Sequence, residues 1–344
     1  MASRDHPAEC LSGTLATVKD TLDFIIIGAQ KAGTSSLYEH LRQHPEIWLP
    51  PAKEAPYFSH DPVFARGWNH YMKMVGFSNP QRQWGTVTPQ YMVGGMYKRG
   101  RGKALADAEY DERTVPLRIY ERLPKVRLVA ILRDPVDRAR SHHQMMAMDG
   151  FEQRSFDDAI AELLQPESLE HSRRHPEEIS GYVTWGEYRR ILSGYYSVFP
   201  SEQLLVVFTA ELEHSPEQLL GRIYDFLGVS PDFIPGNLDV RYRPSGGKRR
   251  FSWMSPHRSW SPQGVKRALK HKRTARAAWH LLPAGRRLRV KQGFDHFGYK
   301  VELWNRRGAQ KASEPSDSTV EHLRAHYAEE AHELATLLQA SLPW

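Results

Sequence analysis

Residues 23–41 read DFIIIGAQKAGTSSLYEHL, and this stretch decides the fold. The run Phe24–Ile27 has the apolar, β-branched composition of a buried strand, and a helical pattern begins at Thr34. Glycine lets the backbone between them approach a ligand closely, and the first amides of a helix attract an anion. The stretch therefore predicts a strand, a phosphate-binding loop over 28–36 and a helix.

The lysine of this loop lies in an unusual place. Gly28 and Gly33 have the four-residue gap of the nucleotide-triphosphate P-loop, which requires a lysine directly after the second glycine. Thr34 stands there instead, and the lysine of the loop is Lys31. The pattern argues against an ATPase or a GTPase. A small-molecule kinase of the same fold remains an alternative, as does a glycine turn that binds nothing.

The rest of the chain alternates strand and helix patterns. Further strands are expected at Trp84–Val87, Val126–Leu132 and Gln203–Phe208. Helices are expected at Thr34–His44, Val115–Leu123, Pro135–Met148, Phe156–Leu164, Gly186–Val198, Pro216–Leu227 and Thr319–Leu338. This alternation predicts a three-layer, P-loop-like α/β fold, in which helices flank a central parallel sheet.

We expect a single domain over residues 23–344, preceded by a flexible N-terminal segment, 1–22. Its α/β core would cover residues 23–240. A C-terminal helix within 318–344 would pack back on that core. Between these two parts, residues 241–317 form a basic C-terminal extension with helical character.

The positive charge of the chain is concentrated in this extension. Residues 241–311 hold 20 Lys and Arg against two acidic residues, whereas the remainder holds 27 basic and 38 acidic residues. Such a tract is typical of a surface that meets a nucleotide, an acidic glycan or an anionic membrane. A solvated basic face is the alternative reading. A nucleic-acid or anionic-membrane binding protein is a hypothesis of a different class, which would leave the glycine loop unexplained.

The composition sets further expectations. No apolar run is long enough to span a bilayer, and residues 1–22 lack the order of a secretory signal. Because Cys10 is the only cysteine, we expect no internal disulfide, no catalytic thiol and a cytoplasmic location. The 17 histidines show no ligand spacing, so we expect no metal site.

A second charged motif follows the strand expected at 127–132. Arg133 comes at the carboxyl end of that strand, Pro135 opens the next helix, and Ser141 lies two helical turns on. The planar guanidinium of Arg133 suits a phosphate. An ion pair of Arg133 with a neighbouring aspartate, Asp134 or Asp137, is the alternative reading.

The two motifs together resemble the nucleotide-dependent sulfotransferases, in the branch of the heparan sulfate sulfotransferases and their bacterial relatives. The resemblance implies a donor, 3'-phosphoadenosine 5'-phosphosulfate (PAPS), and a product, 3',5'-ADP, with no metal. It implies in-line transfer of the sulfuryl group to a hydroxyl, rather than an amine, of a carbohydrate, glycolipid or small-molecule acceptor. Nucleic acid is not an expected partner, whereas peripheral contact with an anionic surface is compatible with the basic tract.

The resemblance also assigns residues to the donor. The 5'-phosphosulfate would be held by the loop residues Gly28, Lys31, Ala32, Gly33, Thr34, Ser35 and Ser36. The 3'-phosphate would be held by Arg133 and Ser141. A basic loop late in the chain would close over the donor, and its candidates are Gly246, Gly247, Lys248, Arg249 and Arg250.

Glu54 falls where the heparan sulfate branch carries its catalytic glutamate, a few residues before an aromatic pair. The resemblance thus makes Glu54 the general base and Lys31 the catalytic cation. A surface carboxylate paired with Lys53 is the alternative for Glu54. The rival bases are three histidines near the site in sequence: His60, His142 and His143.

The chain departs from that branch at one position. A lysine often precedes the Thr/Ser-Pro of a later motif in the branch, whereas this chain has Val87 before Thr88 and Pro89. Valine supplies no charge. Either Lys31 alone stabilises the leaving phosphate, or Lys53 assists it.

Overall fold

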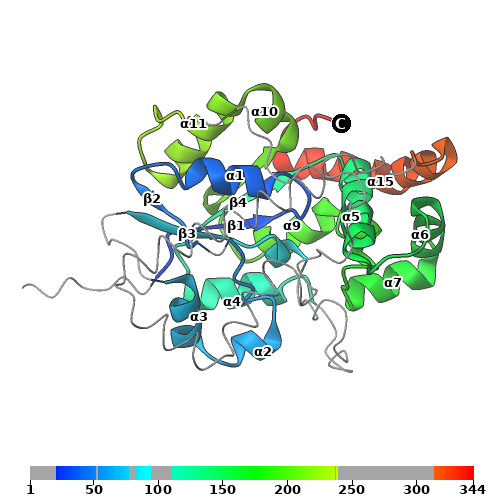
Figure 1. Cartoon of the computed structure of the whole chain (residues 1–344), viewed down its shortest axis with the longest axis horizontal. Coiled ribbons are helices and arrows are strands. Elements are labelled where there is room, and N and C mark those ends of the chain that lie inside the picture. The colour runs from blue at the N-terminus through cyan, green and yellow to red at the C-terminus, as the bar shows by residue number, and fades with distance from the viewer. Residues whose placement is uncertain (1–20, 52, 77–81, 94–110, 237, 239–313) are drawn as a thin grey trace, which may run out of the picture.

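Five parallel strands form the centre of the fold in the order β2-β3-β1-β4-β5 (Figure 1). The computed structural model describes residues 21–51, 53–76, 82–93, 111–236, 238 and 314–344. Within these ranges the strands are β1 (Phe24–Gly28), β2 (Ile47–Trp48), β3 (Gln83–Val87), β4 (Arg127–Leu132) and β5 (Leu204–Phe208). The predicted α/β class with a central parallel sheet is confirmed.

The sheet is apolar on both faces because helices cover both. Every residue of β1 is buried, and β4 is buried from its second residue onward. Figure 1 shows α1 (Thr34–Leu41) and α11 (Pro216–Leu227) on one face of the sheet, and α3 (Trp68–Val75) and α4 (Thr114–Arg122) on the other. The remaining elements near the sheet are α2 (Asp61–Phe64), η1 (Pro89–Met92), α9 (Tyr188–Tyr196), η2 (Ser201–Gln203) and α10 (Thr209–His214).

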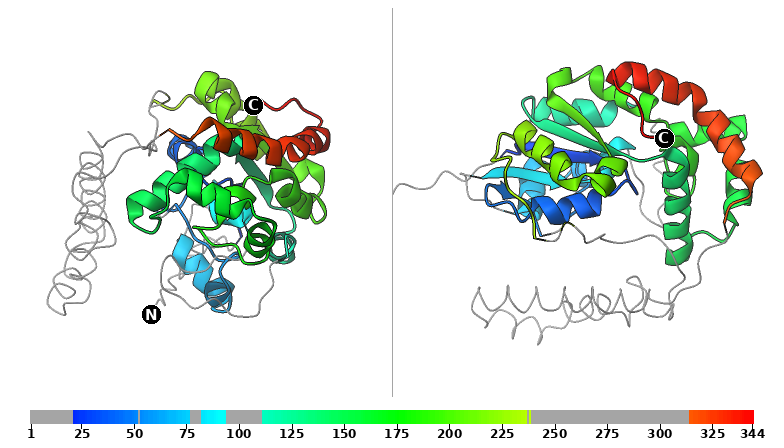
Figure 2. Two further views of the ribbon diagram at one scale, coloured as in Figure 1. Left: turned by 90° about the vertical axis from the view of Figure 1, so that its right-hand side faces the viewer. Right: turned by 90° about the horizontal axis from the view of Figure 1, so that it is seen from above.

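A second group of helices lies beside the sheet and has a hydrophobic cluster of its own (Figure 2). Its members are α5 (Pro135–Asp149), α6 (Phe156–Leu163), α7 (Pro166–Arg174), α8 (Gly181–Thr184) and α15 (Asp317–Leu338). Helix α15 buries Leu323 and Tyr327 in this cluster and Leu334 in the main core. The C-terminal helix thereby spans both clusters. None of the helices in the described ranges is long and apolar enough to cross a membrane.

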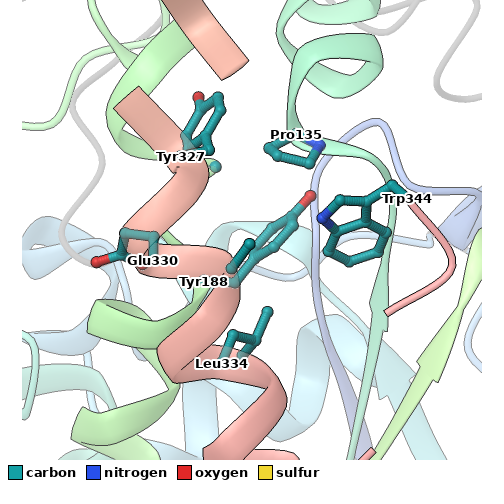
Figure 3. A pocket seen from close by; sticks show the side chains of 8 residues that line it. Pro135, Tyr188, Tyr327, Glu330, Leu334 and Trp344 are labelled. Carbon is teal, nitrogen blue, oxygen red and sulfur yellow. The ribbon is translucent and has the colours of Figure 1, made fainter. Parts of the chain in front are cut away.

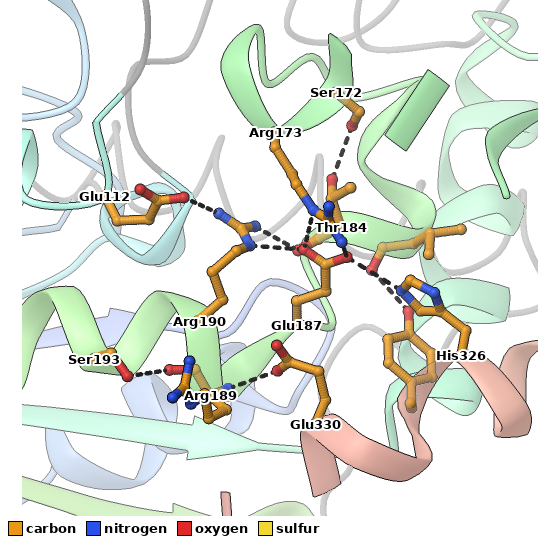
Figure 4. A network of polar contacts seen from close by, with 12 residues as sticks. Glu112, Ser172, Arg173, Thr184, Glu187, Arg189, Arg190, Ser193, His326 and Glu330 are labelled. Carbon is orange, nitrogen blue, oxygen red and sulfur yellow. Dashed lines mark hydrogen bonds and ion pairs between the residues drawn. The ribbon is translucent and has the colours of Figure 1, made fainter. Parts of the chain in front are cut away.

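A buried carboxylate ties three of these helices together (Figure 4). Glu187, 1% exposed in its side chain, accepts hydrogen bonds from Arg173 of α7 and from Arg190 of α9. Its Oε1 also lies 3.1 Å from Nε2 of His326 on α15. Burial by itself raises the pKa of Glu187, but these hydrogen bonds and the charge of Arg190 lower it to about 2. The network fixes α7, α9 and α15 relative to one another.

The strand order determines where a ligand can bind. The chain leaves β1 toward β3 and β2, and it leaves β4 toward β5, so the direction of winding reverses between β1 and β4. In open parallel sheets, ligands bind at the carboxyl ends of the strands at such a reversal. The loop after β1 and Arg133 after β4 flank this point.

The expected N-terminal segment and the expected basic extension lie largely outside the described residues. Leu22, which we grouped with the N-terminal segment, is 3% exposed and belongs to the main core. Residues 241–313 of the basic extension, for which we expect helical character, lie outside the described residues.

Candidate active site

The loop after β1 is anchored to the neighbouring strand and to α10. The amide of Ala29 donates to the carbonyl of Ile131 on β4 at 2.7 Å. The hydroxyl of Thr209 lies 2.7 Å from the carbonyl oxygen of Ala32 and 3.0 Å from that of Leu132. Thr209 is buried, so it links the loop, β4 and α10 from inside the protein.

The two glycines of the loop are required by its geometry. A Cβ atom on Gly28 would lie within 2.6 to 2.9 Å of three side-chain atoms of Met92. Gly33 has φ +99° and immediately precedes α1, in the left-handed region that favours glycine. Gly33 is the N-cap residue of α1 and has no side chain, and the first turn of α1 carries Thr34, Ser35 and Ser36. The positive end of the helix dipole at this turn favours an anion, which is the ligand expected for these residues.

Lys53 connects the loop with the candidate base. Its Nζ donates to Thr34 Oγ1 at 3.1 Å and to Ser35 Oγ at 3.2 Å. The same Nζ lies 3.5 Å from Glu54 Oε1, and the Lys53 side chain is 12% exposed against 37% for Glu54. The ion pair between Glu54 and Lys53, which was the alternative reading of Glu54, is therefore present, and its lysine also contacts the glycine loop.

The other carboxylate oxygen of Glu54 is held by Gln90. Gln90 Nε2 donates to Glu54 Oε2 at 2.9 Å, while Oε1 of Gln90 is buried and has no protein partner among the described residues. The neighbouring backbone is fixed as well. The amide of Ala55 donates to Thr88 Oγ1, and the Tyr91 hydroxyl donates to the carbonyl of Ala55 at 2.6 Å. The segment that carries Glu54 is thereby attached to the carboxyl end of β3.

Arg133 lies at the carboxyl end of β4, where α5 begins. Asp134 caps α5 by accepting from the amides of Val136 and Asp137. Arg133 pairs with Asp137 at 3.1 Å, with side chains 22% and 54% exposed. An exposed pair of this kind is worth less than about 1 kcal/mol, so an incoming phosphate can compete for the guanidinium. Ser141, two turns along α5, is 3% exposed.

A small pocket lies between the start of α5, helix α15 and Trp344 (Figure 3). Its labelled lining residues are Pro135, Tyr188, Tyr327, Glu330, Leu334 and Trp344. The Tyr188 hydroxyl donates to the carbonyl of Arg133 at 2.9 Å. The rings of Tyr188 and Phe208 contact Trp344, at centroid distances of 6.1 and 5.6 Å. Trp344 thus packs against Tyr188, whose hydroxyl holds the backbone of Arg133.

The histidine pair considered as a rival base is packed in the second helical cluster. His142 is fully buried and stacks on Trp185 at a centroid distance of 4.8 Å. His143 Nε2 lies 3.0 Å from the carbonyl oxygen of Arg154, and burial lowers the pKa of His143. These contacts assign both rings to packing. His60 is partly buried and immediately precedes α2.

Two residues of this site, Gln90 and Thr209, were not predicted from the sequence. Gln90 was readable only as part of a Thr-Pro-Gln-Tyr string after a strand, a position where ligand-binding polar residues collect. Thr209 follows β5 in the same way. The predicted donor loop at Gly246, Gly247, Lys248, Arg249 and Arg250 lies outside the described residues. Within the described ranges, no group of three or more His, Cys, Asp or Glu side chains is arranged to hold a metal ion.

The comparisons with known proteins agree with this architecture. Residues 21–240 match the family profile described as "Sulfotransferase domain". The crystal structure of a sulfotransferase from Alicyclobacillus acidocaldarius superposes with a TM-score of 0.59 at 23% identity, covering 93% of this chain and 97% of that one. That similarity shows a shared fold.

The curated relatives act on heparan sulfate, by their names. Heparan sulfate glucosamine 3-O-sulfotransferase 5 of Mus musculus is 27% identical over 216 residues, which cover 62% of this chain and 55% of the relative. Bifunctional heparan sulfate N-deacetylase/N-sulfotransferase 3 of Homo sapiens is 28% identical over 219 residues, covering 61% and 22%. The chain spans about half the length of the first relative and 22% of the length of the second. Since the family profile covers more than half of the chain, the protein belongs to the sulfotransferase domain family.

Proposed function

We propose that this sulfotransferase moves the sulfuryl group of PAPS to an acceptor hydroxyl, with Glu54 as the general base. The observation that carries the proposal is the position of Glu54, which shares Lys53 with the hydroxyls of the glycine loop. The proposed base and the proposed anion-binding loop thus lie together at the carboxyl edge of the sheet, beside the reversal between β1 and β4, which supports the proposal.

The residues of the loop fit a terminal phosphosulfate. Gly28 and Gly33 leave room for the backbone to approach, and the first-turn amides of α1 carry partial positive charge. Lys31 adds a cation within the loop. The partly buried guanidinium of Arg133 suits the 3'-phosphate, and Ser141 is the second residue proposed there.

The donor, when bound, supplies a sulfuryl group that an acceptor oxygen can attack in line. Glu54 would accept the proton of the acceptor hydroxyl, and Gln90 would keep its carboxylate oriented. The helix N-terminus and Lys31 would stabilise the negative charge on the phosphate side. Transfer of this kind depends on positioning and charge, which the site provides.

The names of the curated relatives support a carbohydrate acceptor, and a glycolipid or small molecule bearing a hydroxyl is compatible with the same chemistry. A kinase of the same fold is disfavoured by the family match and by Thr34 in the place of the P-loop lysine.

Titration calorimetry with 3',5'-ADP tests the proposal. We expect the wild-type protein to bind 3',5'-ADP and not ATP. Arg133→Ala should weaken binding roughly tenfold or more, since a charged hydrogen bond is worth about 1.5 to 3 kcal/mol. Arg174→Ala is a matched control, because Arg174 on α7 also pairs with an acidic residue four positions away and lies on the surface. Absence of 3',5'-ADP binding to the wild type would refute the proposal.

A further inference from the structure

Lys53 reaches from the segment after β2 into the glycine loop. Its ammonium donates to the hydroxyls of Thr34 and Ser35 at 3.1 and 3.2 Å, and it lies 3.5 Å from Glu54 Oε1. The side chain is 12% exposed, so it is largely withdrawn from solvent. Lys53 therefore touches both the proposed donor loop and the proposed base.

The surroundings of this ammonium favour an added anion. Thr34 and Ser35 are neutral and belong to the first turn of α1, where the helix dipole is positive. A cation held at a helix N-terminus and largely removed from water is unfavourable unless negative charge compensates it. Glu54 supplies one carboxylate, at a distance longer than a hydrogen bond. A phosphosulfate bound against α1 would add to the negative charge that Glu54 already supplies.

The neighbouring strand offers no charge in this place. Val87 ends β3, is paired with Ile26 of β1, and is fully buried. Its apolar side chain belongs to the main core. The cation that faces the loop from this side of the sheet comes from the β2 segment instead.

We infer that Lys53 is a catalytic residue, whose ammonium contacts the 5'-phosphosulfate and stabilises the leaving phosphate. This inference rests on the proposed function. In the transfer, a bond forms between the acceptor oxygen and sulfur as the bond from sulfur to the bridging oxygen breaks. The electron pair of that bond stays on the 5'-phosphate of 3',5'-ADP, beside Lys53. The acceptor proton passes to Glu54, and the products are the sulfate ester and 3',5'-ADP.

Truncated ligands test the contact without knowledge of the acceptor. Calorimetry would compare 3',5'-ADP with 3'-AMP, which lacks the 5'-phosphate, and with adenosine 5'-phosphosulfate, which lacks the 3'-phosphate. Lys53→Met should weaken the binding of 3',5'-ADP and of adenosine 5'-phosphosulfate about tenfold and leave the affinity for 3'-AMP unchanged. Arg133→Ala should weaken the binding of 3',5'-ADP and 3'-AMP but not the binding of adenosine 5'-phosphosulfate. Equal weakening of all three ligands by Lys53→Met would mean a structural role and overturn the inference.

Turnover of PAPS tests the catalytic part. Conversion to 3',5'-ADP would be measured in single turnovers, with 4-nitrophenol and water as acceptors. Lys53→Met should slow this step about a hundredfold at saturating PAPS, Lys53→Arg should restore part of the rate, and added ethylammonium should raise the rate of Lys53→Ala. Lys125→Ala, which removes an exposed lysine after α4, should match the wild type.

The outcomes separate the two claims. A wild-type protein that neither binds 3',5'-ADP nor converts PAPS would refute the proposed function. A wild type that does both, with a Lys53→Met variant that is folded by thermal melting and equally fast, would refute only the role of Lys53.

Discussion

Gln90 donates its side-chain amide to Glu54 Oε2 at 2.9 Å, although the two residues are 36 positions apart. Gln90 stands in the 3₁₀ turn after β3, and Glu54 in the segment after β2, so two adjacent strand ends bring them together. The bond orients a carboxylate whose side chain is 37% exposed and whose other oxygen pairs with Lys53. We therefore treat Gln90 as a positioning residue for the proposed base.

Replacement of Gln90 should lower kcat without loss of donor affinity. Gln90→Ala leaves Glu54 Oε2 without this donor, and we expect kcat to fall about tenfold while the Kd for 3',5'-ADP stays constant. Gln90→Glu would set a second carboxylate beside the first and should lower kcat further, since the two would share a proton. Gln43→Ala, at an exposed turn just after α1, is the control. A parallel loss of 3',5'-ADP binding would contradict a role confined to Glu54.

Glu54→Gln should abolish transfer and spare donor binding. The amide keeps the size of the side chain but accepts no proton, and general bases contribute roughly 10²- to 10⁴-fold to rate. Single-turnover conversion of PAPS and calorimetry with 3',5'-ADP measure the two effects separately. Retained turnover would move the role of base to another residue. His60 would then be the next histidine to replace, because His142 and His143 are packed among aromatic rings.

Gly33→Ala should impair the loop more than a matched glycine change elsewhere. Gly33 and Gly150 both have positive φ, +99° and +79°, so alanine is strained at either position. A Cβ on Gly33 would also lie 3.2 Å from Leu212, whereas at Gly150 it would meet nothing within 4 Å. We expect the free energy of unfolding in urea to fall by about 1 kcal/mol or more in both variants, and we expect only Gly33→Ala to bind 3',5'-ADP more weakly. Equal affinities of the two variants would show that the loop tolerates a Cβ.

The main architecture was predictable because local pattern and tertiary structure agree. β1 and β4 are apolar runs that are almost fully buried, and β5 is an apolar run that is partly buried. The helices expected from Thr34, Pro135 and Pro216 begin at those residues. The two-residue strand β2 has no such run and forms through its pairing with β3. The short helices α2, α8 and α10 carry too few residues for a clear period, and α7 is polar apart from Leu169 and shows no apolar face.

The candidate site was predictable only in part. The loop and Arg133 each sit directly after a strand, so their position follows from chain order alone. The contact of Lys53 with Thr34 and Ser35 depends on how the segment after β2 folds over α1, which no motif specifies. The same holds for Gln90 and Thr209, whose partners lie 36 and 177 residues away.

Thr209→Val should loosen the loop while nearly preserving side-chain volume. The hydroxyl that serves the carbonyls of Ala32 and Leu132 is lost, and these buried acceptors lose a donor. A buried group left unsatisfied costs about 1 to 3 kcal/mol, which urea unfolding would measure. Thr209→Ser keeps the hydroxyl and should remain closer to the wild type. Faster hydrogen exchange at residues 29–33 in Thr209→Val is expected, and unchanged exchange would argue against the anchoring role.

The buried carboxylate Glu187 should control stability in acid. Its pKa is held near 2, against 4.5 for an ordinary glutamate, by hydrogen bonds from His326 and Arg173 and by the charge of Arg190, which together outweigh burial. A carboxylate with a lowered folded-state pKa stabilises the protein fully above the unfolded value, and this contribution is lost as pH falls from about 4.5 to about 2.

Glu187→Gln should therefore destabilise the protein at neutral pH and flatten its acid dependence. The change leaves Arg173 and Arg190 without their buried partner, so we expect a loss of about 3 kcal/mol in the free energy of unfolding. Glu152, whose pKa is also about 2, should preserve some slope below pH 4.5. Glu333→Gln is the matched control, because it breaks an exposed pair with Arg189 and should cost less than about 1 kcal/mol. Equal effects of the two variants, or an unchanged acid slope in Glu187→Gln, would show that the network seen in Figure 4 does not hold the helices together.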